Sequence, residues 1–128
     1  MAYLIDTNVA IHLRDGDTVA MERVAVLGDA VLMSVVTRVE LEGGVYRDPS
    51  QAAIRRARLD TMLVAIPVLA FDDLSADAYV TIVAHAGYSR RKLLDRMIAA
   101  QALVHHATLV TLNADDFRDI PELRLAAW

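Results

Sequence analysis

Residues 3–13, Tyr-Leu-Ile-Asp-Thr-Asn-Val-Ala-Ile-His-Leu, decide the fold class. Tyr3–Ile5 is a short, wholly apolar run that ends at Asp6, which predicts a buried strand. Asn8–Leu13 then has the character of a short helix. A strand without polar alternation is typical of a sheet that is covered on both faces. The opening of the chain therefore predicts one strand–helix unit of an α/β protein.

The same alternation recurs along the rest of the chain. Further strands are expected at Ala30–Met33, Pro67–Phe71, Leu109–Thr111 and Leu123–Leu125. Further helices are expected at Val19–Leu27, from Ser34 or Thr37 as cap to Tyr46, at Gln51–Val64 after a capping segment Asp48–Ser50, from Ser75 as cap to Ala86, and at Leu94–His106, with a turn at Asn113–Phe117. This order predicts a three-layer α/β sandwich with a parallel sheet of four to five short strands. Since no linker or repeat interrupts it, residues 1–128 are expected to form one domain.

The composition excludes several classes of protein. Of the 128 residues 55% are hydrophobic and the mean hydropathy is +0.34, which excludes an intrinsically disordered chain. The net charge of −4 argues against a wholly cationic nucleic-acid binder. The absence of cysteine excludes thiol catalysis, disulfides and Cys-ligated zinc. Without a secretory signal or an apolar run of about 20 residues, a cytoplasmic location is expected.

Acidic residues follow two of the predicted strands. Asp6 comes directly after the first strand, and Asp115 and Asp116 come shortly after the fourth. In open parallel sheets, ligands bind outside the carboxyl ends of the strands. The alternative is that Asp6 caps the next helix and that Asp115 and Asp116 form a solvated turn.

Two further acids lie on predicted helices. Glu40 shares a helix face with Val36 and Gly44, so it is expected to point inward or toward a crevice. There it needs a cation, an arginine such as Arg38 or Arg90, or a shifted pKa. The alternative is a structural ion pair.

Asp95 lies on the apolar stripe of its helix, formed by residues three, four and seven positions later. The alternative is a carboxylate favoured by the helix dipole.

Four carboxylates at one sheet edge repel one another unless a cation binds. Oxygen ligands without cysteine favour Mg²⁺ or Mn²⁺, and such a site suits phosphodiester cleavage by metal-activated water.

Four segments resemble the motifs of PIN-domain ribonucleases, in order and in register. They are Asp6-Thr7-Asn8, Ser34–Leu41 with Glu40, Leu94–Ala100 with Asp95, and Leu109–Phe117 with its Thr-x-Asn-x-x-Asp-Phe pattern. The ending, Ile120–Leu125 followed by Trp128, is similar to the tails of VapC-type toxins. The resemblance covers the whole chain.

This resemblance implies a PIN fold and the activity of a VapC-like toxin from a bacterial toxin–antitoxin pair. Such toxins are Mg²⁺- or Mn²⁺-dependent endoribonucleases and are commonly homodimers. A VapB-type antitoxin inhibits them by placing a segment, often with a basic side chain, in the acidic site. A heterotetramer or a larger assembly with the antitoxin is therefore expected.

The resemblance also implies roles for single residues. Asp6, Glu40, Asp95 and Asp116 would be catalytic metal ligands, directly or through water. Thr7 and Thr111 would orient carboxylates, and Asn113 and Arg90 would support the site or contact the substrate. The fourth ligand stays open among Asp116, Asp115 and Asn113, with Asp116 favoured. The neighbouring Arg90-Arg91-Lys92 run could hold RNA phosphates or form a solvated loop.

Three other functions share features with this sequence. A haloacid-dehalogenase-like phosphatase also opens with a strand and Asp-x-Asp, but this chain has Asn8 at the second acid. A 5′-nuclease acting on DNA would need insertions that this chain lacks. A catalytically silent PIN-like scaffold that binds a partner is the main alternative, although all four acidic positions are filled.

Overall fold

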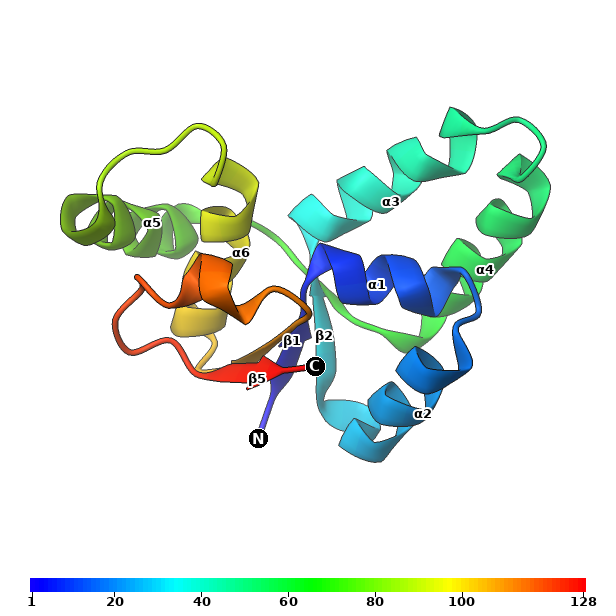
Figure 1. Ribbon diagram of the computed structural model, residues 1–128, viewed down its shortest axis with the longest axis horizontal. Coiled ribbons are helices and arrows are strands. Elements are labelled where there is room, and N and C mark those ends of the chain that lie inside the picture. Colours follow the sequence, from blue (N-terminus) through cyan, green and yellow to red (C-terminus); the bar gives the residue numbers. More distant parts are fainter.

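A computed structural model describes residues 1–128, apart from the side chain of Asp29. Its centre is a parallel sheet of five strands in the order β3-β2-β1-β4-β5 (Figure 1). The strands are β1 Tyr3–Ile5, β2 Val31–Ser34, β3 Val68–Leu69, β4 Thr108–Thr111 and β5 Leu125–Ala127. In the centre, Leu4 lies opposite Leu32 of β2 and Leu109 of β4. The predicted parallel sheet is confirmed.

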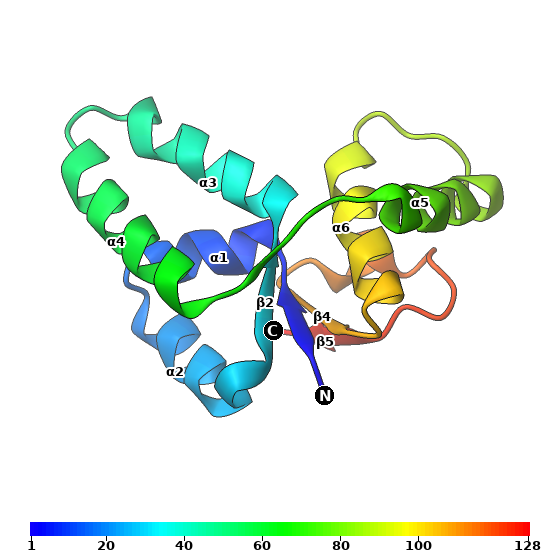
Figure 2. The ribbon, with the colours of Figure 1, turned by 180° about the vertical axis from the view of Figure 1, so that it is seen from behind.

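Helices cover both faces of this sheet. They are α1 Thr7–Arg14, α2 Thr18–Leu27, α3 Val35–Arg47, α4 Ala52–Ala65, α5 Asp73–Ala86 and α6 Leu93–Val104, with short 3₁₀ turns η1 Gly28–Ala30 and η2 Ala114–Phe117. Helices α1 to α4 lie on one side of the sheet and α5 and α6 on the other (Figures 1 and 2). The three-layer α/β sandwich is therefore confirmed. None of the described helices has the length and apolar character needed to cross a bilayer.

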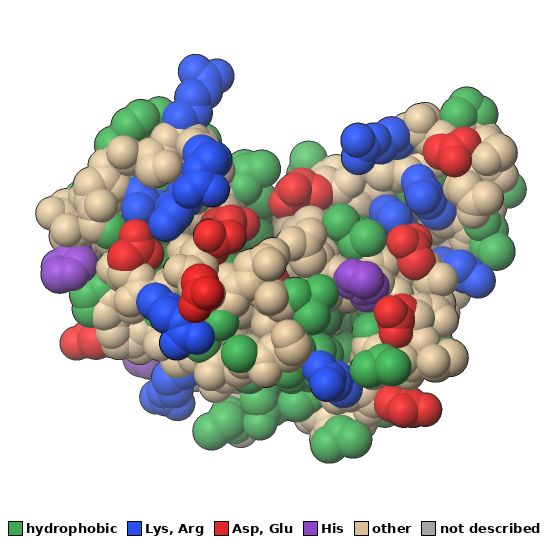
Figure 3. Space-filling view, in the orientation of Figure 1, with side chains coloured by type: hydrophobic (Ala, Val, Ile, Leu, Met, Phe, Trp, Pro, Cys, Tyr) green, Lys and Arg blue, Asp and Glu red, His purple; other side chains and the backbone are tan. Residues whose placement is uncertain are grey.

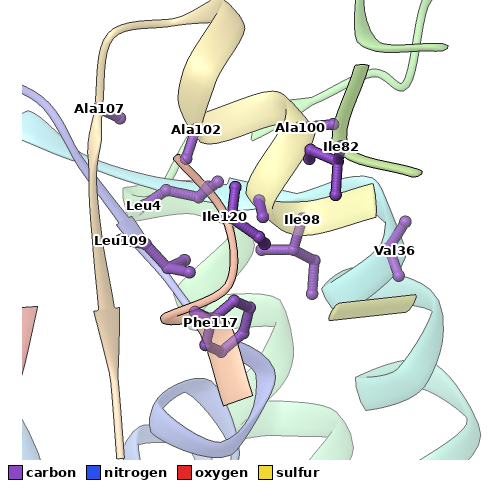
Figure 4. Close-up of a cluster of buried hydrophobic side chains, with 11 residues drawn as sticks. Leu4, Val36, Ile82, Ile98, Ala100, Ala102, Ala107, Leu109, Phe117 and Ile120 are labelled. Carbon is purple, nitrogen blue, oxygen red and sulfur yellow. The ribbon is translucent and has the colours of Figure 1, made fainter. Parts of the chain in front are cut away.

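The core explains why the strands carry no alternating polar pattern. Leu4 and Leu109 point to the side of α5 and α6 and pack with Ile98 and Phe117 (Figure 4). The neighbouring Ile5 belongs to the second cluster, on the side of α1 to α4. Successive strand residues point to opposite faces, so a sheet covered on both faces needs apolar residues at both.

The helix caps confirm one prediction and correct two. Ser34 caps α3, since its hydroxyl accepts a hydrogen bond from the amide of Val36. Helix α5 is capped by Asp72, whose carboxylate accepts from the amide of Ser75, so Ser75 is not the cap. The segment before α4 does not cap it either, because the Asp48 carboxylate bonds within its own turn. Helix α4 begins after Gln51 without a side-chain cap.

The C-terminal strand also lies later than predicted. We expected it at residues 123–125, and the structure places it at Leu125–Ala127. Leu125 pairs with Leu109, and the amide of Trp128 continues the ladder by donating to the carbonyl of Thr111. The register with β4, which three apolar residues alone cannot reveal, sets these bounds.

Two adjacent glycines in α3 differ in their surroundings, which gives a first prediction. A Cβ at Gly44 would lie 2.6 Å from Nη1 of Arg14, whereas a Cβ at Gly43 would meet nothing within 4 Å. Arg14 is buried and donates twice to the Asp15 carboxylate. Because Nη1 ends a flexible side chain that is nevertheless buried, we expect the contact to offset the helix-favouring effect of alanine, so that Gly44→Ala does not raise the free energy of unfolding. Gly43→Ala should raise it by about 0.5–1 kcal/mol, because alanine favours the helix.

Urea unfolding of the two variants checks this pair. Equal stabilisation by both substitutions would contradict the close packing of Arg14 on α3.

Candidate active site

Asp6 lies at the carboxyl end of the central strand and at the start of α1. Its side chain is buried, with 3% exposure. One carboxylate oxygen accepts from the amide of Thr7 at 2.7 Å, and the other accepts from the hydroxyl of Thr111 at 2.9 Å. Burial raises the pKa of Asp6, the two hydrogen bonds oppose this, and Asp116 adds a smaller rise. Asp6 does form the N-terminal cap of α1, which was the alternative to a site residue. It also interacts electrostatically with Asp116.

Glu40 lies on α3 beside the start of α1. The hydroxyl of Thr7 donates to Glu40 Oε1 at 2.9 Å, and the hydroxyl of Thr37 lies 2.9 Å from that of Thr7. Glu40 itself is exposed, so of the two expected directions, inward or toward a crevice, the inward one is wrong. The two threonines of this hydrogen-bonded group, Thr7 and Thr37, are buried.

The predicted arginine partners of Glu40 are not confirmed. No ion pair within 4.0 Å joins Glu40 to an arginine in the part of the chain that the structure describes. Arg38 instead lies 3.9 Å from Glu42, one turn along α3. Arg90 is exposed on the loop before α6.

Asp95 lies in the first turn of α6 and faces the other three acids. It is half-buried, and burial together with the charges of Asp6, Asp116 and Glu40 raises its pKa to about 6. The nearby Arg91 opposes this rise. The helix dipole alone would lower the pKa of this carboxyl, so burial together with the repulsion of the neighbouring acids outweighs the dipole. The charges of the other three acids thus all act on Asp95.

The two aspartates of η2 face different ways. Asp116 is half-buried and raises the pKa of both Asp6 and Asp95. The side chain of Asp115 is 93% exposed and pairs with Arg118 at 2.6 Å. Asn113 is exposed, and its backbone amide donates to the hydroxyl of Thr111. Of the three candidates for the fourth ligand, Asp116 is the one that interacts with the other acids.

The basic segment before α6 is held to the loop after η2. Asp119 accepts from Arg96 at 3.2 Å and lies 3.6 Å from Nζ of Lys92. Arg96 also donates to the carbonyl of Gly87. Arg91 is exposed, and it is the cation of this segment that lowers the pKa of Asp95. The segment therefore lies beside the acids with its arginines in solvent.

The space-filling view shows where these groups meet. The molecule is hollowed between the half that contains α5 and α6 and the half that contains α3 and α4 (Figure 3). Acidic side chains lie around this hollow, and basic side chains lie on its rim (Figure 3). The hollow lies above the carboxyl ends of the strands (Figure 1). This is the place where parallel sheets bind their ligands.

The donor chemistry of the hollow fits a hard divalent cation. It offers carboxylate oxygens whose repulsion raises the pKa of Asp95, and a cation would relieve that repulsion. Among the described residues, no three acidic or histidine side chains are already gathered closely enough to cage a metal. Mg²⁺ is ordinarily held by one or two carboxylates together with waters and substrate phosphates, so an open site of this kind suits it.

The structure adds one residue to the site that the sequence analysis had considered only as a cap. Thr37 lies one helical turn before Glu40, and its hydroxyl is fully buried beside that of Thr7. The spacing of three residues from Glu40 on the same helix face was the available signal.

A second cavity lies away from the acids, between α2 and α4. It has a volume of about 810 Å³ and is lined mainly by apolar side chains. From α2 the lining includes Met21 and Val24, and from α4 it includes Ala57 and Met62. Arg58 lies at its edge and donates to the carbonyl of Asp15. No pattern in the sequence predicts this apolar groove.

Comparison with known families identifies the domain that carries these acids. The family model described as PIN domain matches residues 3–123 of the sequence. The chain belongs to the PIN-domain family. The match includes all four acids of the hollow, and the motif resemblance found in the sequence is confirmed.

Individual relatives agree with this assignment. Ribonuclease VapC2 from Rickettsia felis is 26% identical over 136 residues, which cover 100% of this chain and 98% of the relative. The crystal structure of VapBC2 from Rickettsia felis, bound to a DNA fragment from its promoter, contains a chain of the same fold, with a TM-score of 0.86. The two chains are 24% identical, and the comparison covers 100% of this chain and 99% of that one. VapBC-1 from nontypeable Haemophilus influenzae gives a TM-score of 0.78 at 26% identity and covers 100% and 98% of the two chains.

Proposed function

We propose that this PIN domain is a metal-dependent endoribonuclease and the toxin of a VapBC-like toxin–antitoxin pair, acting in the cytoplasm. The observation that supports this most strongly is that burial and the charges of Asp6, Asp116 and Glu40 together raise the pKa of Asp95 to about 6. A merely structural cluster would be expected to contain matching arginines, yet beside burial and hydrogen bonds the charges that act on Asp6 and Asp95 come mainly from other acids. The similarity to Ribonuclease VapC2 supports RNA as the substrate.

We assign Asp6, Glu40, Asp95 and Asp116 as the ligands of the cation, directly or through water. When bound there, Mg²⁺ or Mn²⁺ would lower the pKa of a water and stabilise the oxygen that leaves the phosphorus. Thr111 and Thr7 hold Asp6 and Glu40 in fixed orientations through 2.9 Å hydrogen bonds. Such outer hydrogen bonds tune the basicity and direction of the ligands.

Basic and polar groups on the rim would hold the substrate. Arg90 and Arg91 are exposed on the segment before α6, where Arg91 lowers the pKa of Asp95, and both can pair with phosphates of the RNA. Asn113 is exposed and bonds to Thr111 through its backbone amide, so its side-chain amide is offered to the sugar or base. The chain thereby binds the anionic backbone although its net charge is −4.

Incubation of purified protein with RNA tests the activity. We expect cleavage with Mg²⁺ or Mn²⁺ and none with EDTA. Absence of both RNA cleavage and metal binding would favour the catalytically silent, partner-binding alternative, whereas metal binding without cleavage of total RNA would indicate a narrow substrate that the sample lacks.

We further propose that a VapB-like antitoxin binds this protein, which itself forms a homodimer, so that the complex is a heterotetramer or larger. Structures of VapBC complexes contain relatives of the same fold, which supports this partner. The apolar groove between α2 and α4 offers a surface for an apolar helix of the antitoxin. A basic segment of the antitoxin would complement the four acids of the hollow.

A pair of alanines on α4 tests the groove as the antitoxin site. Ala57 lines the groove and is exposed, whereas the equally exposed Ala53 does not line it. We expect Ala57→Arg to weaken binding of the cognate antitoxin at least about 30-fold, corresponding to about 2 kcal/mol for a central interface position. Ala53→Arg should bind as the wild type does. Equal affinities of the two variants in calorimetry would exclude this groove as the antitoxin site.

A further inference from the structure

We propose that Thr37 is a positioning residue that fixes the carboxylate of Glu40 by way of Thr7. This inference rests on the proposed metal-dependent function and adds a residue to it. Thr37 has no exposed surface, and Thr7 is 7% exposed. The two hydroxyl oxygens lie 2.9 Å apart, and Thr7 Oγ1 lies 2.9 Å from Glu40 Oε1.

The direction of the two hydrogen bonds follows from counting protons. A threonine hydroxyl has one proton to donate, and an ionised carboxylate can only accept. The proton of Thr7 is used toward Glu40, so the bond between the two hydroxyls must be donated by Thr37. Thr37 thus donates to Thr7, and Thr7 donates to Glu40.

This relay matters because Glu40 is exposed and its long side chain is otherwise free to rotate. No ion pair among the described side chains holds Glu40, so the Thr7 hydroxyl is the contact that selects its direction. The donation from Thr37 leaves Thr7 with a single acceptor for its own proton and strengthens that second bond by polarisation. The relay also joins α3 to the start of α1 at the edge of the hollow.

Asp6 is held by a relay of the same form. The amide of Asn113 donates to Thr111 Oγ1 at 3.0 Å, and Thr111 donates to Asp6 Oδ2 at 2.9 Å. In both cases a threonine hydroxyl donates to a site carboxylate and accepts a hydrogen bond from another group of the protein. The repetition of this arrangement at two of the four acids supports a positioning role rather than a packing role for Thr37.

Affinity for Mn²⁺ in the absence of RNA tests the relay. Valine has the shape of threonine without the hydroxyl, so Thr37→Val should preserve packing and weaken Mn²⁺ binding about tenfold, as expected for loss of a group that orients a ligand. Thr37→Ser keeps the donor and should stay within about twofold of the wild type. Thr61→Val is the control, because Thr61 lies on α4 and bonds to the carbonyl of Ala57. Binding is followed by electron paramagnetic resonance, and the melting temperature shows that each variant is folded.

The outcomes separate this inference from the function on which it rests. Wild-type affinity in Thr37→Val, or an equal loss in Thr37→Ser, overturns the role of the hydroxyl. Should Thr37→Val fail to fold, the smaller Thr37→Ala removes the same donor and is judged by the same tenfold criterion. A wild-type protein that binds no Mn²⁺ and cleaves no RNA overturns the proposed function itself.

Discussion

Asp95→Asn is expected to reduce RNA cleavage by at least about a hundredfold while leaving the metal-free protein more stable than the wild type. The activity falls because a ligand is lost from the proposed metal site, and even residues that only support such ligands cost up to about a hundredfold. Stability rises because the ionised Asp95 is partly buried among Asp6, Glu40 and Asp116. Asparagine keeps the shape and removes the repulsion.

The gain in stability has a defined pH dependence. The folded-state pKa of Asp95 is about 6, against 3.8 as its ordinary value, so its ionisation destabilises the folded state. In EDTA, the advantage of Asp95→Asn should be near zero below about pH 4, grow between pH 4 and 6, and stay constant above. Its size above pH 6 is expected to be on the order of 1–2 kcal/mol, after discounting for partial exposure.

Manganese should reverse the order of the two proteins. At a hundred times the dissociation constant, a bound ion adds about 2.7 kcal/mol to the stability of the wild type. The variant should gain little. Thermal melts in EDTA and in Mn²⁺ measure both effects, with the exposed Asp77→Asn on α5 as the control. Destabilisation of Asp95→Asn in EDTA would instead point to a structural role for this carboxylate.

Gln101→Leu should have the largest effect on folding without acting through the site. Gln101 on α6 is fully buried. Its amide nitrogen donates at 3.1 Å to the carbonyls of Leu69 and Ala70, and its oxygen accepts from the hydroxyl of Ser34. It thereby joins α6 to the ends of β2 and β3. Leucine would leave the buried hydroxyl of Ser34 and the two part-buried carbonyls without their partner, at about 1–3 kcal/mol for each buried group.

We therefore expect Gln101→Leu to lower the free energy of unfolding by about 3–5 kcal/mol. Gln51 is the other glutamine of the chain; it is exposed and makes no side-chain cap bond to α4. Gln51→Leu should change stability by no more than about 0.5 kcal/mol. Chemical denaturation measures the free energy of unfolding of both variants. A decrease of less than about 1 kcal/mol in Gln101→Leu would show that the groups bonded to Gln101 find other partners.

The fold was predictable because its signals are local and repeated. Runs such as Tyr3–Ile5 are too short and too apolar to be anything but strands between helices, and their alternation with helices requires a parallel sheet. The position of Asp6 and Asp116 at one edge follows from that topology. The order of the acids along the chain, matching the PIN-domain pattern, supplied the rest.

What the sequence could not provide depends on packing between distant segments. The exposure of Glu40 follows from how α1 and α3 lie together, which helix periodicity does not encode. Asp115 and Asp116 are adjacent, and the choice between them depends on the turn that pairs Asp115 with Arg118. The apolar groove lies between α2 and α4, which are distant in the sequence, so it is a feature of tertiary structure alone.

The most direct test of the central claim is to type the ends of RNA fragments produced by the purified protein with Mn²⁺. Attack by a metal-activated water breaks the phosphorus–oxygen bond without using the ribose 2′-hydroxyl. The account predicts discrete fragments with one phosphate and one hydroxyl end, no 2′,3′-cyclic phosphate, and no fragments with EDTA or with Asp95→Asn. Cyclic phosphate ends, or cleavage that persists in EDTA, would contradict it.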